Sequence, residues 1–345
     1  EATPGERGSP GVVTVASTPI DSDLRIKEYS APELCRLFGN TTFPLVSLAG
    51  MKLPTVILDD IESIVFHDNV FNAHPDLVEF GNKAFPERLH EGHGFTNGTN
   101  LRALRKDGKT LHLGLIKFFD NMRYANAGGR AIFPPGQYFE GRLVSDITGE
   151  QQSTLWELDV KLHELDGKPY DVSTALVPHY FGGGIAALPR DGGMIFVGQR
   201  IYQRDGITKA QGGGTFGVGG YTIWKPEFID SIRDGSRTVE DVVEEHVRIH
   251  AEQKLGITTF EPVRTVYVWE PGGLVAPITF IKTDMATKDI ALAISNGVAA
   301  NVQHAVARFP LREEDLQLTT QRYRLSSGSL AAAKYAAEQN LNRTS

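Results

Sequence analysis

Histidine and carboxylate side chains gather between positions 67 and 93 of the sequence. The four histidines of this window are His67, His74, His90 and His93, and the acidic residues Asp68 and Glu91 lie directly beside two of them. Imidazole and carboxylate groups are suitable ligands for zinc or iron. The spacing His90-x-x-His93 could bring two rings to one ion, so His67, His90 and His93 are the candidate metal ligands.

This spacing permits a metal site without defining one. It lacks the helical His-Glu-x-x-His pattern of zinc proteases, and Gly92 and Gly94 favour a loop instead. We therefore expect no metal and no cofactor, and a loop that contacts solvent or another subunit. The alternative is an enzyme on a β-rich scaffold that uses His67, His74, His90 and His93, with or without a metal.

A glycine-rich string also matches a known letter pattern. The run Gly212-Gly213-Gly214-Thr215-Phe216-Gly217 fits G-x-G-x-x-G. In a dinucleotide site that turn must open a helix, so that the pyrophosphate meets the positive end of the helix. Residues 218–224 are instead typical of a strand, and we expect no nucleotide site here.

Other reactive groups have simpler explanations. Cys35 lies on an expected helix without a histidine nearby in the sequence, which favours a buried and inert thiol. The carboxylate pairs Asp59-Asp60 and Glu244-Glu245 could act as acid and base at a glycosidic bond, but adjacent side chains point in different directions. The sequence shows no catalytic motif, so no catalytic residue is assigned and we expect that the protein is not an enzyme.

The three tryptophans allow another function. Trp156, Trp224 and Trp269 are the rings on which a ligand or a sugar could stack. A ligand-binding or carbohydrate-binding β domain is therefore a further alternative, although burial in the core is the favoured position for these side chains.

Composition excludes several classes of protein. The 345 residues carry a net charge of −7 without a basic stripe, which argues against sequence-specific binding of nucleic acid. No apolar run is long enough to span a membrane. A single cysteine excludes an intrachain disulfide framework. We expect a soluble globular protein.

The ends of the chain differ from its body. Residues 1–22 contain proline, glycine and small polar residues and are typical of an extended N-terminal arm. Residues 23–345 form the body, either as one domain or as two lobes at about 23–235 and 236–345. The sequence begins at Glu1 without an apolar signal segment, which leads us to expect a trimmed or truncated form.

The expected fold class is α+β, rich in β structure with antiparallel hairpins. Asp107-Gly108 and Asp166-Gly167 each lie between strand-like runs and predict two hairpin tips. The second predicted hairpin covers residues 154–177. Other runs of strand character are 43–48, 55–58, 63–66, 194–197, 221–224 and 263–269.

Fewer segments have a helical pattern than a strand-like one. Two long amphipathic helices are expected at residues 238–254 and 286–309, because valines and isoleucines recur there at helical spacing. Shorter helices are expected at 31–38, with Ser30 as N-cap, and at 74–85 and 330–340.

One stretch resembles a known family. Residues 208–221, which read TKAQGGGTFGVGGY, are followed by 247–256, VRIHAEQKLG, and then by Pro262. This order resembles the C-terminal part of tailed-phage major capsid proteins. The resemblance implies a structural shell or virion protein that associates with copies of itself, in a virion or a cytoplasmic particle. The arm 1–22 and the hairpin 154–177 would then be its contact elements, and this is our first expectation.

Overall fold

A computed structural model describes most of the chain. The described residues are 24–86, 97–197, 200–204, 207–211, 215–216, 218–222, 225–295, 302–303, 306–309, 312, 315–316 and 324–341. The predicted arm 1–22 and the loop that carries His90, Glu91 and His93 lie outside them. No helix in these ranges is both long enough and apolar enough to cross a membrane.

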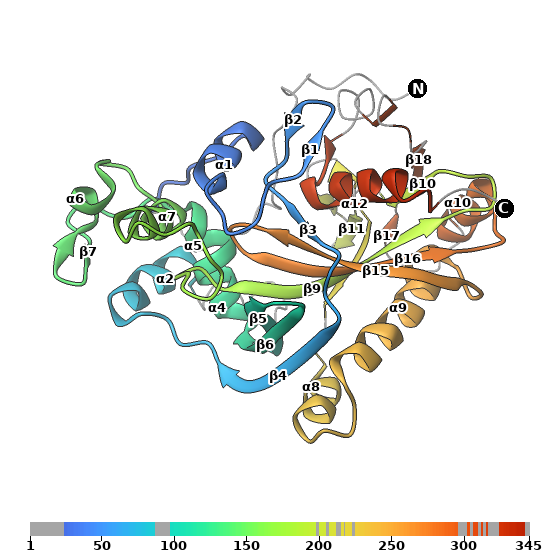
Figure 1. Cartoon of the computed structure of the whole chain (residues 1–345), viewed down its shortest axis with the longest axis horizontal. Helices are drawn as coiled ribbons and strands as arrows, with labels where there is room; N and C mark the ends of the chain where they lie inside the picture. The colour runs from blue at the N-terminus through green and yellow to red at the C-terminus, as the bar shows by residue number, and fades with distance from the viewer. Residues whose placement is uncertain are drawn as a thin grey trace.

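A curled, ten-stranded sheet forms the centre of the molecule (Figure 1). Seven strands follow one another across it: β3 (Val56–Leu58), β15 (Glu261–Glu270), β16 (Leu274–Lys282), β9 (His179–Leu188), β5 (Thr99–Asp107), β6 (Thr110–Lys117) and β4 (Ser63–Val70). Three more join by pairing beside this path: β10 (Met194–Val197), β14 (Gly219–Thr222) and β18 (Val306–Phe309). The prediction of both helices and a large β component is confirmed.

The sheet is mixed and not purely antiparallel. Strand β16 pairs with β9 in parallel, as β4 does with β6. The hairpins β5–β6 and β15–β16 are antiparallel. Every residue of β9 is buried, and its side chains contribute to two separate hydrophobic clusters.

In the described ranges, four small sheets accompany the central one. Their strands are β1 (Ser47–Leu48) with β2 (Met51–Lys52), β7 (Tyr138–Phe139) with β8 (Arg142–Leu143), β11 (Arg200–Arg204) with β12 (Ile207–Gln211) and β17 (Val302–Gln303), and β13 (Thr215–Phe216) with β19 (Arg324–Leu325).

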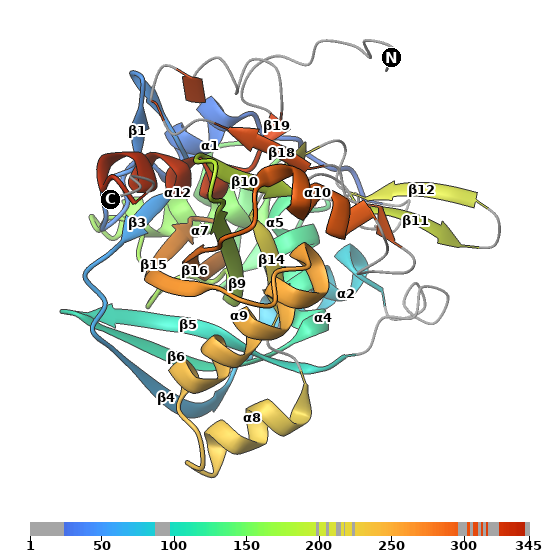
Figure 2. The same cartoon turned by 90° about the vertical axis from the view of Figure 1, so that its right-hand side faces the viewer.

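The helices form where the sequence supplies caps and stops. Helix α1 (Ala31–Phe38) begins with the predicted cap at Ser30, which forms a capping box with Glu33. Helix α9 (Val239–Leu255) has a similar box at Thr238 and ends at Gly256 with φ +66°. It crosses one face of the sheet from β4 to β14 (Figure 2). The predicted helices at 31–38 and 238–254 are confirmed.

The remaining helices are all shorter than α9. They are η1 (Pro75–Leu77), α2 (Val78–Ala84), α4 (Phe118–Asn121), η2 (Met122–Asn126), α5 (Ala127–Arg130), α6 (Val144–Thr148), α7 (Leu155–Leu165), α8 (Pro226–Arg233), α10 (Thr287–Ser295) and α12 (Ser327–Glu338). Segments α4, η2 and α5 follow one another directly, and η2 is a π-helical turn. Such turns occur often at functional sites.

The predicted hairpin at 154–177 is wrong. Thr154 and Glu157 form a capping box that starts helix α7. Leu155, Leu158 and Leu162 are spaced for a helix face, while the short alternation around Asp159 fits a strand equally well. The capping box at Thr154 favours a helix over a strand for this segment.

The predicted long helix at 286–309 is also wrong. Among the described residues of this range, Thr287–Ser295 is helical, whereas the valines at 302 and 306 begin the strands β17 and β18. Their side chains recur at helical spacing, but β-branched residues also favour strands.

Candidate ligand-binding cavity

A cavity of about 370 Å³ lies where several separate segments meet. The segment before α1, the run α4–η2–α5, helix α7 and the turn between β15 and β16 form its walls. Figure 1 shows α1, α5 and α7 beside one end of the sheet. The volume falls at the lower end of the range of small-molecule sites.

Backbone pairing brings the first wall to the cavity. Ile26 bridges to Ala131, and the amide of Lys27 donates to the carbonyl of Arg130 at 2.9 Å. The amide of Ile132 donates in turn to the carbonyl of Arg25 at 2.8 Å. This short ladder fixes Glu28 and Tyr29 beside the end of α5.

Arg130 is the buried cation of the cavity. Its exposed fraction is 5%. Its Nη1 donates to the two carboxylate oxygens of Glu28 at 3.3 and 3.4 Å. Its Nε is buried and has no hydrogen-bond partner among the described residues. A guanidinium has five donors, so this buried charge is only partly satisfied.

Glu28 is a loosely held partner. Its side chain is 66% exposed, in contrast to the buried guanidinium that it contacts. Charge-assisted hydrogen bonds are usually about 2.7 to 2.9 Å long, and both contacts to Arg130 exceed this range. The ion pair therefore leaves Arg130 available to a better acceptor.

The indole of Trp156 forms an aromatic wall between two glycines. A Cβ at Gly129 would lie 1.9 Å from its Nε1, and one at Gly272 would lie 3.2 Å from its ring. Tyr29 packs at its side with ring centroids 5.5 Å apart. Glycine at both positions is thus a condition for placing this ring in the wall.

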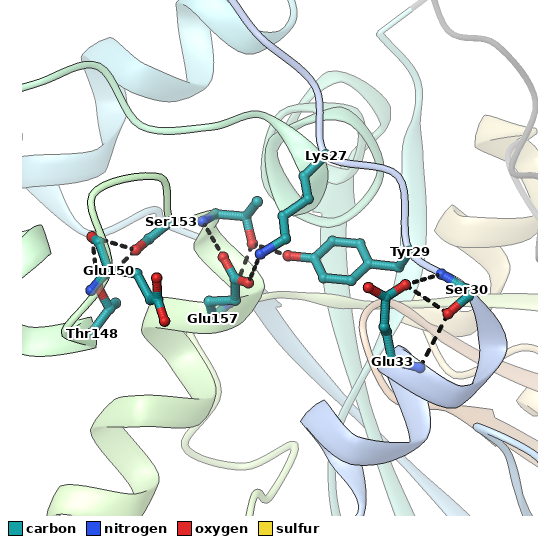
Figure 3. A network of polar contacts seen from close by, with 9 residues as sticks. Lys27, Tyr29, Ser30, Glu33, Thr148, Glu150, Ser153 and Glu157 are labelled. Carbon is teal, nitrogen blue, oxygen red and sulfur yellow. Dashed lines mark hydrogen bonds and ion pairs between the residues drawn. The ribbon is translucent and has the colours of Figure 1, made fainter.

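A polar network holds the wall in place (Figure 3). The Tyr29 hydroxyl and Thr154 Oγ1 are 2.7 Å apart, and Thr154 also accepts from the amide of Glu157. Glu157 forms an ion pair with Lys27. Burial raises the pKa of Tyr29 far above its usual value, so the phenol stays neutral. Each of these side chains has a partner, which indicates a supporting role.

Glu270 adds a carboxyl group from the end of β15. Its Oε1 accepts from the amide of Gly328 at 2.9 Å and from Ser327 Oγ at 3.3 Å. Burial raises its pKa, and these two hydrogen bonds oppose the increase. A carboxyl with a raised pKa that lines a cavity can exchange a proton with a ligand or accept its hydrogen bond.

The predicted histidine cluster does not come together in the described part of the chain. Nε2 of His67 lies 2.8 Å from Nδ1 of His112, whereas His74 caps η1 and lies near Asp76 and Glu140. Within the described ranges no three His, Cys, Asp or Glu side chains could hold one metal ion. Because His90 and His93 lie outside these ranges, the role of the cluster stays a prediction.

The other candidates lie apart from the cavity. Trp269 is buried in the core beside Phe43, and Trp224 lies outside the described residues. Cys35 is half-buried, its Sγ donates to the carbonyl of Lys52, and burial raises its pKa. Of the two proposed stacking residues that the structure describes, Trp156 lines the cavity and Trp269 does not.

The carboxylate pairs and the glycine string give no site among the described residues. Glu244 pairs with Arg248 and Glu245 with Arg237, while Asp59 and Asp60 are exposed. All four glycines of the 212–217 string lie outside the described residues, and β14 follows as the predicted strand.

Sequence reasoning did not find Glu28, Arg130 or Glu270. They come from three distant segments and belong to no motif. The only local signal is glycine: Gly128-Gly129 precedes Arg130, and Pro271-Gly272-Gly273 follows Glu270 between two apolar runs. A charged residue beside such a turn could have been considered as a site residue.

A second buried polar group lies under α7. Asp159 accepts from the amides of Leu176 and Val177 and from the hydroxyl of Tyr170. His163 bonds the carbonyl of Asp159 through Nδ1 and Thr174 through Nε2. These bonds fasten residues 170–177 to α7, so the cluster has a structural role.

Models of known protein families and curated proteins were compared with this chain, and none of them matches it.

Proposed function

We propose that this protein binds a small organic molecule in the cavity between Arg130, Trp156 and Glu270. The observation that carries the proposal is the buried, partly satisfied guanidinium of Arg130 in a cavity of about 370 Å³. A buried polar group without partners is costly, and such groups are retained where a ligand or water completes them.

The walls suit a ligand with an apolar body. Trp156, Met122, Pro271 and Leu274 offer apolar surface, and the charged groups are few and fixed. Binding sites for small molecules combine such surface with a few converging polar groups. This proposal develops the ligand-binding alternative in which Trp156 contacts the ligand.

The test is a search for ligands that depend on the cavity. A library of small organic acids, amides and alcohols is screened by thermal unfolding and by ligand-observed NMR. A ligand at 100 times its Kd should stabilise the folded state by about 2.7 kcal/mol.

A pair of matched variants makes the test specific. Leu274→Trp replaces an aliphatic side chain of the cavity wall with a larger indole ring and should abolish binding. Leu292→Trp makes the same change on α10, where Leu292 is 60% exposed, and should leave binding intact. If every ligand found binds Leu274→Trp as well as the unchanged protein, the cavity is not the site.

A shell subunit is the second candidate function. The resemblance of residues 208–262 to tailed-phage major capsid proteins supports it. The first part of its proposed contact hairpin at 154–177 forms the helix α7 (Leu155–Leu165), so no hairpin is present there to reach a neighbouring copy. Light scattering distinguishes the candidates, because a shell of many copies and a small oligomer differ greatly in mass.

A further inference from the structure

We infer that the ligand carries a carboxylate that binds Arg130, and that Glu28 occupies this place in the ligand-free protein. This inference rests on the proposed function and names the chemical class of the ligand.

The first support is the position of the guanidinium. Arg130 has an exposed fraction of 5% and lines the cavity, so its charge lies away from bulk solvent. A planar guanidinium matches a carboxylate through two parallel hydrogen bonds. Nη1 alone of its donor atoms has a partner among the described residues, and Nε has none.

The second support is the character of Glu28. Both of its oxygens lie near the same atom, Nη1, instead of forming the two-pronged contact. Its side chain is 66% exposed and has no other polar partner among the described residues. Because the Glu28 carboxylate already contacts solvent, its displacement from Arg130 costs little desolvation, and the incoming ligand carboxylate keeps the buried guanidinium paired.

The third support concerns the rest of the ligand. The Trp156 ring and the Pro271-Gly272-Gly273 turn provide an apolar wall for a ring or chain. Both hydrogen bonds that Glu270 accepts end on Oε1, which leaves Oε2 for a hydroxyl or amino group. The expected ligand is therefore a small cyclic carboxylic acid with an apolar body, with a donor group as an optional addition.

The experiment compares acids with their neutral amides. Benzoate, phenylacetate and 3-phenylpropionate are titrated by calorimetry and NMR, together with benzamide, phenylacetamide and 3-phenylpropionamide. At least one acid should bind at least tenfold more tightly than its amide. Equal binding of acids and amides would overturn the carboxylate inference and leave the proposed function standing.

Two variants test whether Arg130 and Glu28 cause the preference for acids over amides. Arg130→Gln should weaken binding of the acid by about ten- to a hundredfold, since a hydrogen bond to a charged group is lost. It should leave binding of the amide unchanged. Glu28→Gln removes the competing carboxylate and should tighten binding of the acid by about two- to fivefold.

Glu62→Gln is the matched control for Glu28→Gln. Glu62 is also 66% exposed and paired, but with Lys109 at the β5–β6 hairpin. The variant Glu62→Gln should leave binding of the acid unchanged. If Arg130→Gln does not fold, Glu28→Gln decides: unchanged or weaker acid binding would overturn the inference. If no acid or amide binds and the wider screen is also empty, the proposed function itself fails.

Discussion

Gly129 presents its α-carbon to the indole nitrogen of Trp156, so closely that a Cβ there would lie 1.9 Å from Nε1. The two residues belong to neighbouring helices, α5 and α7, which contact each other along this line. The same α5 ends at Arg130. The packing of one glycine against one ring therefore fixes the distance between the aromatic wall and the charged group of the cavity.

Gly129→Ala should separate these helices. The added methyl cannot fit beside Trp156, and overpacking of this kind costs about 1 to 3 kcal/mol of unfolding free energy. Urea unfolding measures the loss. Trp156→Phe removes the crowded nitrogen, so the double variant should lose less than the sum of the two single variants. Strict additivity would show that the contact is absent.

Thr154→Val should destabilise the support of the same wall. Thr154 is fully buried, caps α7 and lies within hydrogen-bond distance of the Tyr29 hydroxyl. Loss of a cap costs about 0.5 to 2 kcal/mol, and an unsatisfied buried hydroxyl adds about 1 to 3 kcal/mol. Chemical denaturation should show a clear decrease in stability.

Ser30→Ala is the control for Thr154→Val. Ser30 caps α1 but bonds no buried hydroxyl, so its loss should be limited to about 1 kcal/mol. Tyr29→Phe in the Thr154→Val background should restore part of the stability. An equal effect of the two cap variants would contradict the role assigned to Tyr29.

Local signals in the sequence predicted the parts of the fold that local chemistry determines. Ser30 and Glu33 set the start of α1, Gly256 ends α9, and Asp107-Gly108 joins β5 to β6. In each case residues a few positions apart supply the hydrogen bonds or the positive φ that the element needs.

Long-range pairing was not predictable in this way. Strand β9 gains its parallel partner β16 from nearly a hundred positions further along the chain. Glu28, Arg130 and Glu270 meet for the same reason, because the sheet and α5 bring distant segments together. Periodicity alone also cannot separate α7 from a strand, since short apolar runs fit both.

Asp159→Asn should destabilise the protein at neutral pH. The carboxylate accepts from two backbone amides and a tyrosine hydroxyl through both of its oxygens, and asparagine would replace one oxygen with an NH2 donor that faces at least one of these donors. The expected loss of unfolding free energy is about 1 to 3 kcal/mol. Asp166→Asn, at a side chain that is 68% exposed, is the control and should change little.

The pH dependence of Asp159 gives a separate measurement. Burial, the largest cause, raises its pKa from 3.8 to about 6. The unfolded chain then loses the proton first as pH rises, so the contribution of Asp159 to stability decreases between about pH 4 and pH 6. The difference between the unchanged protein and Asp159→Asn, followed by urea unfolding, should be largest at the low end of this window. A constant difference would contradict the raised pKa.

His179→Leu should make the protein less sensitive to acid. His179 is fully buried between the rings of Tyr170 and Trp269, and neither ring nitrogen has a hydrogen bond of good geometry with a described residue. Burial lowers its pKa from 6.5 to about 3, and the attraction of Asp171 opposes this only in part. The folded protein therefore keeps the ring neutral, while the unfolded chain takes up a proton below about pH 6.5.

The contribution of His179 to stability is thus complete above pH 6.5 and is lost as pH falls towards 3. One pKa unit corresponds to about 1.4 kcal/mol, so the unchanged protein should lose about 2 to 3 kcal/mol more than His179→Leu between pH 7 and pH 4.5. At pH 7 the leucine should be neutral or stabilising, because it removes an unsatisfied polar group. Urea unfolding at both pH values measures this, with His112→Leu as the control at a half-buried ring that already has a partner. Parallel pH curves for His179→Leu and the unchanged protein would show that the buried ring does not control acid unfolding.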